Sequence, residues 1–471
     1  MKNQEKSRST SQGTRRRANC INRVESTESE LSSRSGLSAI AEYLEHHGII
    51  KLIAQRLSMM KSSSKGAGVE AIVLQLLCFF IDGTKSSLTW FDFLQRTASH
   101  ASILGLGVSE LISSHTAKRF LRKFTLSSMR ILESIELALF QWRLRVEQPQ
   151  VITLCIDSVV YDNDDAHQRQ GVSPTYKKVK GFQPVNVIWN GYTVLSRFRR
   201  GSSHGNHGTF VPYAIRKVTS AIREVNPDAE IVFKFDSGFF DEKVFTECTN
   251  QGVFCVMTAR MVSGVKEAAE SVPEDKWSQL NKKEASWRYA QINYKPGSWG
   301  EKTGPVSAVY TSLVRDEATH PVLEFARPDQ IILTNVDLKH ADKPSSIQSA
   351  KDVVLLNHSR GKDELVHRGT KEFGTEKMPC KRFFMNGGYY HFMVIAHNLL
   401  IAFQRDVVAQ EEPELMNATP TTLRRRVIDI AGRVIRTSRR IILKVAKEHD
   451  GPSLLERLWS LIPRSEPAFS P

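Results

Sequence analysis

Three acidic residues occupy positions at which carboxylates could hold divalent metal ions. Asp157 and Asp236 each follow a short, mostly apolar run. Glu364 lies in a more polar segment, with Arg360 four residues before it and Lys371 seven residues after it. Mg²⁺ prefers hard carboxylate oxygens and binds through few of them, because it keeps several waters. Two such ions could activate a water or hydroxyl and stabilise the leaving oxygen of a phosphodiester.

Each of these acids also has an ordinary structural explanation. An aspartate at the end of a strand is often a turn residue, and Asp236 is followed by a Ser-Gly pair. Arg360, Glu364 and Lys371 would project from one helical face, as the members of a surface ion-pair ladder also do. The residue types alone therefore leave both explanations open.

The segment 151–258 carries patterns that are typical of both strands and helices. Strands are predicted at 151–160, 184–189, 192–198, 231–235 and 253–258, with a helix at 210–225. Asn190 and Gly191, between the second and third strands, predict a tight hairpin. A three-stranded meander followed by helix, strand, helix and strand indicates a mixed α/β sheet of the ribonuclease-H type.

The expected strand order would bring the acids together. In a sheet of this type the first strand is central and the fourth lies beside it. Asp157 and Asp236 are therefore expected to converge although 79 residues separate them. Asp162, Asp164 and Asp165 could also supply the first carboxylate, but they fall in a loop after the strand, so Asp157 is favoured.

The predicted fold class is α/β, with a ribonuclease-H-like catalytic core that a β-rich insertion interrupts and a helical N-terminal domain precedes. The predicted regions are a disordered basic tail (1–35), a helical, DNA-binding domain (36–148), the first part of the core (149–260), the β-rich insertion (261–353), the second part of the core with the Glu364 helix (354–410) and a basic C-terminal region (411–471).

Two basic segments are candidate DNA contacts. Lys118, Arg119 and Arg122 lie on a predicted helix with one basic and one apolar face. A purely structural helical subdomain is an alternative for this region. The C-terminal segment that contains Arg436, Arg439 and Arg440 could form a basic hairpin or a basic helix, and the sequence does not decide between them.

Composition narrows the class of protein. The chain has 471 residues, a formal net charge of +15 and a pI of about 9.5. This charge favours a polyanionic partner such as double-stranded DNA, because neutralising phosphates releases counterions. Six cysteines without a C-x-x-C pair argue against a zinc module and against a secreted disulfide framework. We expect reduced thiols, no membrane-spanning stretch and a cytoplasmic location.

The polar segment resembles a known signature. Arg360, Glu364 and Lys371 match in register the motif Y-x-x-R-x-x-x-E-x-x-x-x-x-x-K of insertion-sequence DDE transposases. Asn357 stands where this YREK-type signature has its tyrosine. In the family this tyrosine contacts the DNA phosphate near the cleavage point, and Asn357 in its place removes no metal ligand.

The resemblance, which is nearest to the thirteen-eighty group of bacterial insertion sequences, extends over roughly residues 37–443. The matching segments are Ile156-Asp157 with the downstream acids Asp162, Asp164 and Asp165 and then His167, Arg200-Gly201 with His204-Gly205, residues 228–239, and Cys380 to Phe384. Relatives can also stack an extruded base on a tryptophan of the insertion. Trp277, Trp287 and Trp299 lie there, although ordinary core packing is the favoured explanation for each.

The resemblance implies an enzyme that binds two Mg²⁺ (or Mn²⁺) ions through Asp157, Asp236 and Glu364. It would nick DNA at the ends of an insertion sequence and then use the free 3′ hydroxyl for strand transfer, with no covalent protein–DNA intermediate. Arg360 and Lys371 would hold phosphates. The implied assembly is a homodimer in a synaptic complex of a bacterial cytoplasm. An inactive or domesticated DNA-binding relative, and a ribonuclease-H-like nuclease without joining activity, are the alternatives.

Overall fold

The computed structural model describes residues 23–61, 63, 65–165, 168–203, 208–282, 285–314, 329–339, 345–374, 377–448 and 451–462. Within these ranges, the side chains of five residues lie outside the description. They are Lys282, Ala285, Lys302, Lys362 and Glu364.

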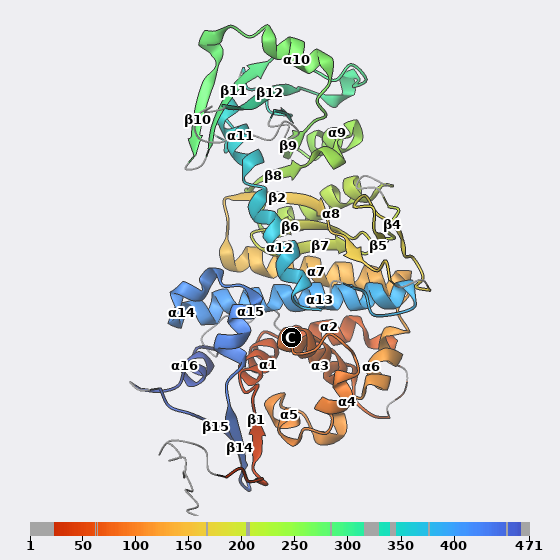
Figure 1. The fold of residues 1–471 in the computed structure, drawn as a ribbon, viewed down its shortest axis with the longest axis vertical. Coiled ribbons are helices and arrows are strands. Elements are labelled where there is room, and N and C mark those ends of the chain that lie inside the picture. The colour runs from red at the N-terminus through yellow and green to blue at the C-terminus, as the bar shows by residue number, and fades with distance from the viewer. Residues whose placement is uncertain are drawn as a thin grey trace, which may run out of the picture.

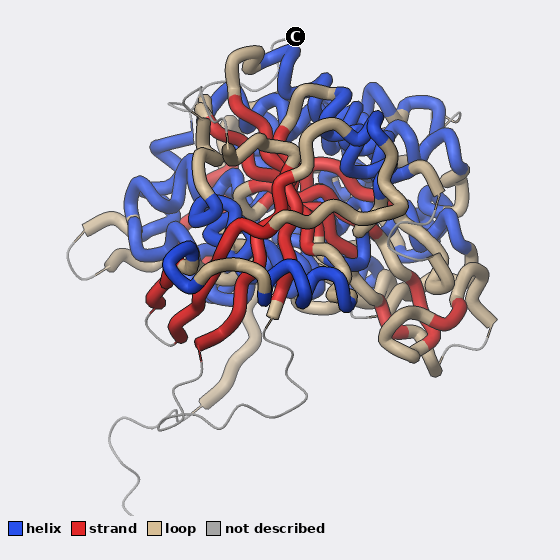
Figure 2. Tube along the Cα trace, turned by 90° about the horizontal axis from the view of Figure 1, so that it is seen from above, coloured by secondary structure: helices blue, strands red, loops and turns tan. Residues whose placement is uncertain are grey.

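A nine-stranded mixed sheet forms the middle and the upper end of the molecule (Figure 1, Figure 2). Its strand order is β10-β11-β12-β13-β9-β8-β2-β6-β7. The strands are β2 (Val151–Ser158), β6 (Val185–Trp189), β7 (Tyr192–Arg197), β8 (Glu230–Phe235), β9 (Phe254–Thr258), β10 (Ser278–Lys282), β11 (Ala285–Ile292), β12 (Ser307–Val314) and β13 (Gln330–Thr334).

The pairing around β2 agrees with the prediction from the sequence. β2 pairs antiparallel with β6 and parallel with β8, and β8 pairs parallel with β9. The first strand is therefore flanked by the second and the fourth. At the hairpin between β6 and β7, Asn190 and Gly191 both have positive φ, 44° and 86°. That backbone suits a two-residue hairpin turn and explains the Asn-Gly pair.

The segment predicted as a β-rich insertion continues this same sheet. β13 pairs antiparallel with β9, and β12, β11 and β10 follow as an antiparallel meander. The sequence predicts strands at 287–294, 306–314 and 330–336, which overlap β11, β12 and β13, whereas it does not predict β10. In Figure 1 this part forms the upper end of the molecule, with the helix α10 (Ser263–Glu270) above it.

Helices cover both faces of the sheet, and the side chains of β8 alternate between the two layers. Ile231 and Phe233 point into the main core, which the long helices α7 (Leu126–Glu147), α8 (Phe210–Val225) and α13 (Phe383–Phe403) share. Val232 belongs to a second cluster together with residues of α11 (Ala350–His358). The next helix, α12 (Gly361–Lys371), places Val366 against Cys155 of β2 and Ile188 of β6.

The region before the sheet is helical, as predicted. Its helices are α1 (Leu37–His46), α2 (Ile49–Arg56), α3 (Val69–Asp82), α4 (Trp90–Leu94), α5 (Ala98–Ile103) and α6 (Ser114–Leu121). α3 is almost wholly buried and ends at Gly83, whose φ of 63° suits a helix end. The Ser113 hydroxyl caps α6 by accepting a hydrogen bond from the Thr116 amide at 3.3 Å.

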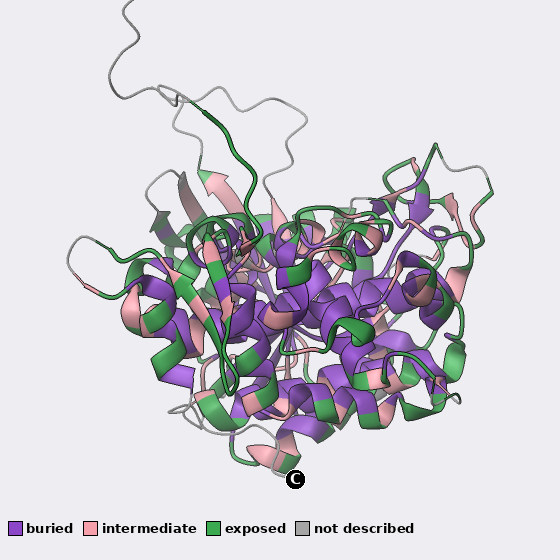
Figure 3. Ribbon diagram, turned by 90° about the horizontal axis from the view of Figure 1, so that it is seen from below, coloured by how far each residue is buried: buried purple, intermediate pink, exposed green. Residues whose placement is uncertain are grey.

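The central helix α13 corrects one expectation from the sequence. The helical segment Phe383–Glu411 is long and apolar enough, by length and composition, to cross a membrane. About four-fifths of its apolar window is buried inside the structure, in the way a core helix is (Figure 3). The expectation that no stretch reaches this length was therefore wrong. In the structure this helix packs against α3 and α7.

The two ends of the chain meet in a second, three-stranded sheet with the order β1-β14-β15. It comprises β1 (Glu30–Ser32), β14 (Gly432–Arg436) and β15 (Ile441–Val445). The C-terminal basic segment is therefore a hairpin. The predicted disordered tail was too long, because β1 pairs with β14 and Ser35 is fully buried. The first 22 residues of that tail lie outside the described part.

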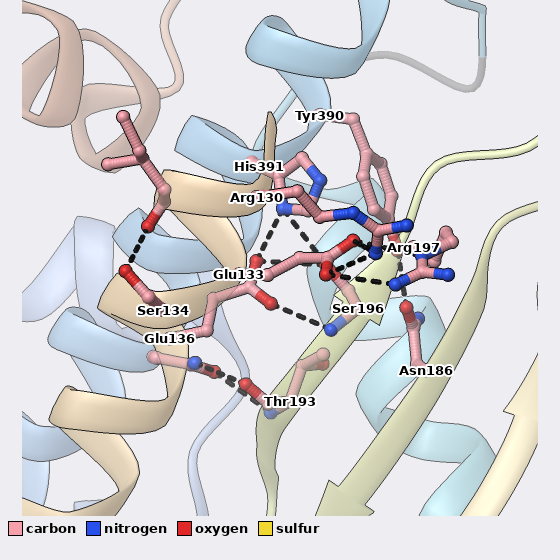
Figure 4. A network of polar contacts seen from close by, with 12 residues as sticks. Arg130, Glu133, Ser134, Glu136, Asn186, Thr193, Ser196, Arg197, Tyr390 and His391 are labelled. Carbon is pink, nitrogen blue, oxygen red and sulfur yellow. Dashed lines mark hydrogen bonds and ion pairs between the residues drawn. The ribbon is translucent and has the colours of Figure 1, made fainter. Parts of the chain in front are cut away.

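A buried polar network joins α7, β7 and α13 (Figure 4). The carboxylate of Glu136 accepts hydrogen bonds from the amide and the hydroxyl of Ser196 at 2.7 and 2.8 Å, and lies 2.7 Å from Nδ1 of His391. One turn earlier, Glu133 forms ion pairs with Arg197 and Arg130. These contacts satisfy charges inside the core and fix α7 against the sheet.

Arg424 ties the C-terminal region to the helical region. It lies in a π-helical turn (Arg424–Ile428) that follows α15 (Pro420–Leu423). Its buried guanidinium donates to the carbonyls of Phe80 and Ile81 at 3.0 and 2.7 Å and to that of Glu372 at 3.0 Å. The first two carbonyls belong to the last turn of α3, where helical partners are missing.

The remaining α-helices of the described chain are α9 (Glu242–Asn250), α14 (Ala409–Glu411) and α16 (Leu454–Leu461).

We predict that Arg424→Met lowers the free energy of unfolding by about 2–4 kcal/mol, because three buried carbonyls lose a charged donor. Urea denaturation of the purified protein measures this loss. The neighbouring Arg425 is exposed, so Arg425→Met is the matched control and should change stability by about 0.5 kcal/mol or less. Equal losses in the two variants would contradict a special role for Arg424.

Candidate active site

The parallel pairing of β2 with β8 places two acids side by side. Ile156 is in register with Phe235, so Asp157 and Asp236 come next along the two strands, at their carboxyl ends. Both lie on the side of the sheet that α12 covers, because Asp236 contacts Arg360 and Asp157 contacts His367. The predicted convergence of these two acids is confirmed by their positions.

An open cleft of about 630 Å³ surrounds the two acids. Four described basic side chains line it. They are Lys177, Arg360, Arg368 and Lys371. The other lining residues are Asp157, Ser158, Val159, Val160, Tyr176, Asp236, His367 and Glu372. The lining of the cleft thus combines acids with cations, which suits a phosphodiester that must approach metal ions.

Asp157 is held by two hydrogen bonds. Its Oδ1 atom accepts from the Ser158 amide at 2.7 Å, and its Oδ2 atom lies 3.2 Å from Nε2 of His367. Burial acts to raise the pKa of Asp157, but the hydrogen bond and charge of His367, with smaller effects from Ser158 and Arg360, leave this pKa below its usual value. Asp157 is therefore an ionised carboxylate at neutral pH.

The sequence reasoning missed His367. It lies three residues after Glu364 and seven after Arg360 on α12, so the helical spacing that linked those two residues could also have singled it out. Its second ring nitrogen, Nδ1, lies 3.4 Å from the side-chain amide of Asn186 on β6. His367 thus bridges the side chains of Asp157 on β2 and Asn186 on β6, which fixes the orientation of the Asp157 carboxylate.

Asp236 has a different environment. Its Oδ1 atom accepts from the Gly238 amide at 2.9 Å, as a turn residue does, and its Oδ2 atom lies 3.6 Å from Nη2 of Arg360. Burial raises the pKa of Asp236, and the charge of Asp157 adds to this effect against the opposing charge of Arg360. Asp236 is therefore both a turn residue and a cleft residue. Two neighbouring carboxylates with this mutual repulsion would gain from a bound cation.

Arg360 stands directly before α12 and keeps unused hydrogen-bonding capacity. Its contact with Asp236 is too long for a strong hydrogen bond. Its Nε atom is buried and has no hydrogen-bond partner among the described residues. Lys371, at the other end of α12, places its ammonium 5.9 Å from the ring centre of Tyr161. Both cations line the cleft and could receive phosphate oxygens.

Glu364 lies on α12 between Arg360 and Lys371. The third predicted acid thus belongs to the helix that borders the cleft. Its side chain is outside the described part of the structure, so the predicted contact of Glu364 with the other two acids remains a prediction.

A buried ion pair attaches α12 to the sheet. Lys234 of β8 is 3% exposed, and its ammonium donates to Asp363 at 2.6 Å and to the Ser359 hydroxyl at 3.0 Å. Lys234 is two residues before Asp236, and Asp363 is next to Glu364. The pair was missed in the sequence, although a lysine inside an apolar strand is itself a sign of a buried partner.

Asn357, where the motif expected from the sequence would have a tyrosine, is a buried residue that does not line the cleft. It is buried on α11, donates to Oε1 of Gln330 at 2.9 Å and accepts from the Thr258 hydroxyl at 2.9 Å. These bonds join α11 to β9 and β13. Asn357 therefore has a structural role in this chain.

The basic residues of α6 lie on a different surface. Arg119 and Lys123 line a pocket of about 460 Å³ together with Lys61 and Lys65, and Arg122 is exposed beside it. Lys118, on the same helix, is half-buried. None of the predicted α6 contacts is among the described residues of the acidic cleft.

The basic residues of the C-terminal hairpin are also remote from the described cleft lining. Arg436 is exposed but engaged, with Glu30 at 3.1 Å and the Ser102 hydroxyl at 2.6 Å. Arg439 and Arg440 lie in the exposed turn between β14 and β15. This hairpin projects from the lower end of the molecule in Figure 1.

The weaker candidates fall outside the cleft or outside the description. Asp162, Asp164 and Asp165 do not line the cleft, and Asp165 forms an exposed ion pair with Lys377 at 2.7 Å. His167, His204 and His207 lie outside the described residues. Among the tryptophans, Trp299 is core, stacked on Phe240 and in tilted contact with Phe245. Trp277 is half-buried against Arg288, and Trp287 is half-buried against His358.

The described side chains supply part of the ligand set of a hard divalent cation. Asp157 and Asp236 offer carboxylate oxygens, which suit Mg²⁺ or Mn²⁺ better than softer metals. The described side chains contain no group of three acidic, histidine or cysteine residues that could hold an ion. A Mg²⁺ site needs only one or two carboxylates besides waters and substrate phosphates, so Asp157 and Asp236 are chemically suited to bind such an ion.

Comparison with known proteins identifies related chains. The family model described as transposase DDE domain group 1 matches residues 17–467. No curated protein matches the chain. Among solved structures, the piggyBac transposase synaptic complex with hairpin DNA, solved by cryo-EM, is similar at 12% identity and a TM-score of 0.32. The match covers 83% of this chain and 80% of that one. This likeness is too low to transfer any residue role.

We predict that Lys234→Met lowers the free energy of unfolding by about 2–4 kcal/mol, because it leaves the Asp363 carboxylate without its buried partner. Urea denaturation again measures the effect. Lys243→Met, at an exposed position, is the control. In a double-mutant cycle, adding Asp363→Leu to Lys234→Met should restore part of the loss. Strictly additive effects would show that the pair does not attach α12 to the sheet.

Proposed function

The chain belongs to the transposase DDE domain group 1 family, and we propose that it cuts DNA at the ends of an insertion sequence and joins those ends to target DNA. One observation carries this proposal. Asp157 and Asp236 lie side by side at the ends of neighbouring parallel strands, in a cleft whose walls are basic. A transposase needs such a site, because one phosphodiester must reach both metal ions and phosphate-binding cations.

The core of the enzyme is proposed to be ribonuclease-H-like. The order β7-β6-β2-β8-β9 supports this assignment, because β6 alone runs antiparallel to the other four strands. The strands β10 to β13 are then the insertion, which is attached to the free edge of β9.

Each residue of the cleft has a proposed role. Asp157, Asp236 and Glu364 hold two Mg²⁺ (or Mn²⁺) ions, which when bound supply activation of the attacking hydroxyl and stabilisation of the leaving oxygen. Arg360 binds a phosphate oxygen with its planar guanidinium, and Lys371 adds a point charge beside it. His367 orients Asp157 through the hydrogen bond described above, as an outer partner of a metal ligand does.

The same active site catalyses two successive steps. Water first cleaves the strand and leaves a 3′ hydroxyl, and that hydroxyl then attacks a second phosphodiester. Each step exchanges one P–O bond for another, so it needs no covalent link to the protein. The ionised Asp157 and the basic walls remain the same throughout, and only the nucleophile and the bound strand change.

DNA outside the cleft is proposed to contact Lys118, Arg119 and Arg122 on α6 and Arg436, Arg439 and Arg440 on the hairpin. Five of these six are exposed and Lys118 is half-buried, which leaves cationic groups accessible to phosphates. Two copies of the chain would hold the two inverted-repeat ends in a homodimeric synaptic complex, in a bacterial cytoplasm.

Glu364→Gln and Asp236→Asn should each lower Mg²⁺-dependent cleavage by about a thousandfold, because each removes a metal-binding carboxylate while keeping its shape. The assay follows nicked and joined products on plasmid DNA that carries the inverted repeats flanking the coding region. Both variants should bind that DNA as the wild type does. Cleavage without any joined product would favour the plain nuclease. Binding without cleavage by the wild type would favour the inactive relative.

Mg²⁺ should raise the midpoint of thermal unfolding of the wild type, because a ligand that binds only the folded state stabilises it. The double variant Asp157→Asn, Asp236→Asn should lose this response, and Ca²⁺ should serve as a non-catalytic substitute for the ion. The matched control is Asp162→Asn, at an acid outside the cleft lining. A full Mg²⁺ response in the double variant would place the ion elsewhere.

A further inference from the structure

A small hairpin that has no role in the site so far stands at the rim of the cleft. Three short strands, β3 (Tyr161–Asp162), β4 (Ser173–Pro174) and β5 (Lys180–Phe182), form a separate sheet in the order β3-β5-β4. The turn between β4 and β5 carries Tyr176 and Lys177, and both line the cleft together with Asp157 and Asp236.

The turn holds these two residues in a fixed place. The Thr175 amide and hydroxyl both donate to the Val179 carbonyl, at 2.9 and 2.8 Å, and the Lys178 amide donates to the Thr175 carbonyl at 3.0 Å. Lys178 has a left-handed φ of 63°. This is the three-residue hairpin geometry in which a tight turn is followed by one left-handed residue. Tyr176 and Lys177 are therefore the central residues of a well-defined turn.

The hairpin is also fixed to the body of the protein. The strands approach so closely that a Cβ atom on Gly181 would lie 2.0 Å from the Tyr161 carbonyl oxygen, and one on Gly201 would lie 2.1 Å from the Ser173 carbonyl oxygen. The Ser202 amide donates to the Ser173 hydroxyl at 2.8 Å. The position of the turn relative to the acids is thus set by backbone contacts on both sides.

The chemistry of the tip combines a ring with positive charge. Tyr176 is 59% exposed and is the one Phe, Trp or Tyr among the described lining residues. The Lys177 ammonium lies 5.9 Å from its ring centre, and Lys178 and Lys180 are exposed on the same hairpin. An exposed ring beside cations is the combination with which proteins bind single-stranded nucleic acid, by stacking on bases and attracting phosphates.

We propose that this hairpin binds the DNA strand at the cleavage point, with Tyr176 stacked on an unpaired base and Lys177 against the adjacent phosphate. The inference deepens the proposed function and depends on it for the identity of the strand. A base inside a duplex has both faces covered by its neighbours, so only an unstacked base can use the ring. The hairpin would therefore select DNA that is opened next to Asp157.

Binding of a short oligo-dT strand with one internal 2-aminopurine tests the proposal, with the full chain in Ca²⁺. Tyr176→Ala should weaken single-strand binding about tenfold, the effect of one lost stacking contact. It should also abolish the quenching of 2-aminopurine fluorescence, whereas duplex binding should stay the same. Tyr176→Phe should keep both affinity and quenching. Lys177→Gln should reduce the slope of log affinity against log salt by about one.

Trp459→Ala, at another exposed aromatic on α16, is the control and should behave as the wild type. The proposal is overturned if Tyr176→Ala binds and quenches as the wild type does, if it weakens single-strand and duplex binding equally, or if Tyr176→Phe fails as Tyr176→Ala does. These outcomes are separate from those of the cleavage assay. A wild type that quenches through Tyr176 but never cuts DNA would refute the transposase and leave the hairpin site standing.

Discussion

The parallel register between β2 and β8 is the constraint on which the site depends. It sets two acids next to each other at the ends of buried strands, where burial, with the charge of Asp157 adding to it, raises the pKa of Asp236. The surrounding structure holds this arrangement in place. Lys234 and Asp363 pair beneath it, and Val366 packs on the adjoining strands. Two neighbouring carboxylates repel each other and so destabilise the folded state locally. A bound cation relieves this repulsion.

The helix α12 supplies most of what the acids need from outside the sheet. Arg360 directly precedes it, and His367 and Lys371 lie on it. Their spacing keeps the three side chains on one face, and each lines the cleft. The preceding helix, α11, has another task, since its Asn357 bonds to two strands. The boundary between structural and chemical residues therefore falls at the break between the two helices.

Local patterns in the sequence predicted a large part of this architecture. The long strands, the Asn-Gly hairpin and the capped basic helix have a clear period or a specific turn residue, so they could be found. The short strands of the rim hairpin have too few residues to show a period, and β1 pairs with a strand about 400 residues away. Partners such as Lys234 with Asp363 and His367 with Asp157 depend on long-range packing, so residue types alone could not assign them.

One continuous core runs from the first helices to the last, and α13 is its centre. Gly387 and Gly388 on that helix let Met129 and Phe124 approach so closely that a Cβ atom would lie 2.4 and 2.9 Å from them. The helical region therefore shares its hydrophobic core with α13 and is not an independently packed module. A chimaera that exchanged the first 148 residues for those of a relative would have to exchange the matching side of α13 as well. The proposed DNA contacts on α6 are thus more readily changed by altering surface side chains than by exchanging the whole helical region.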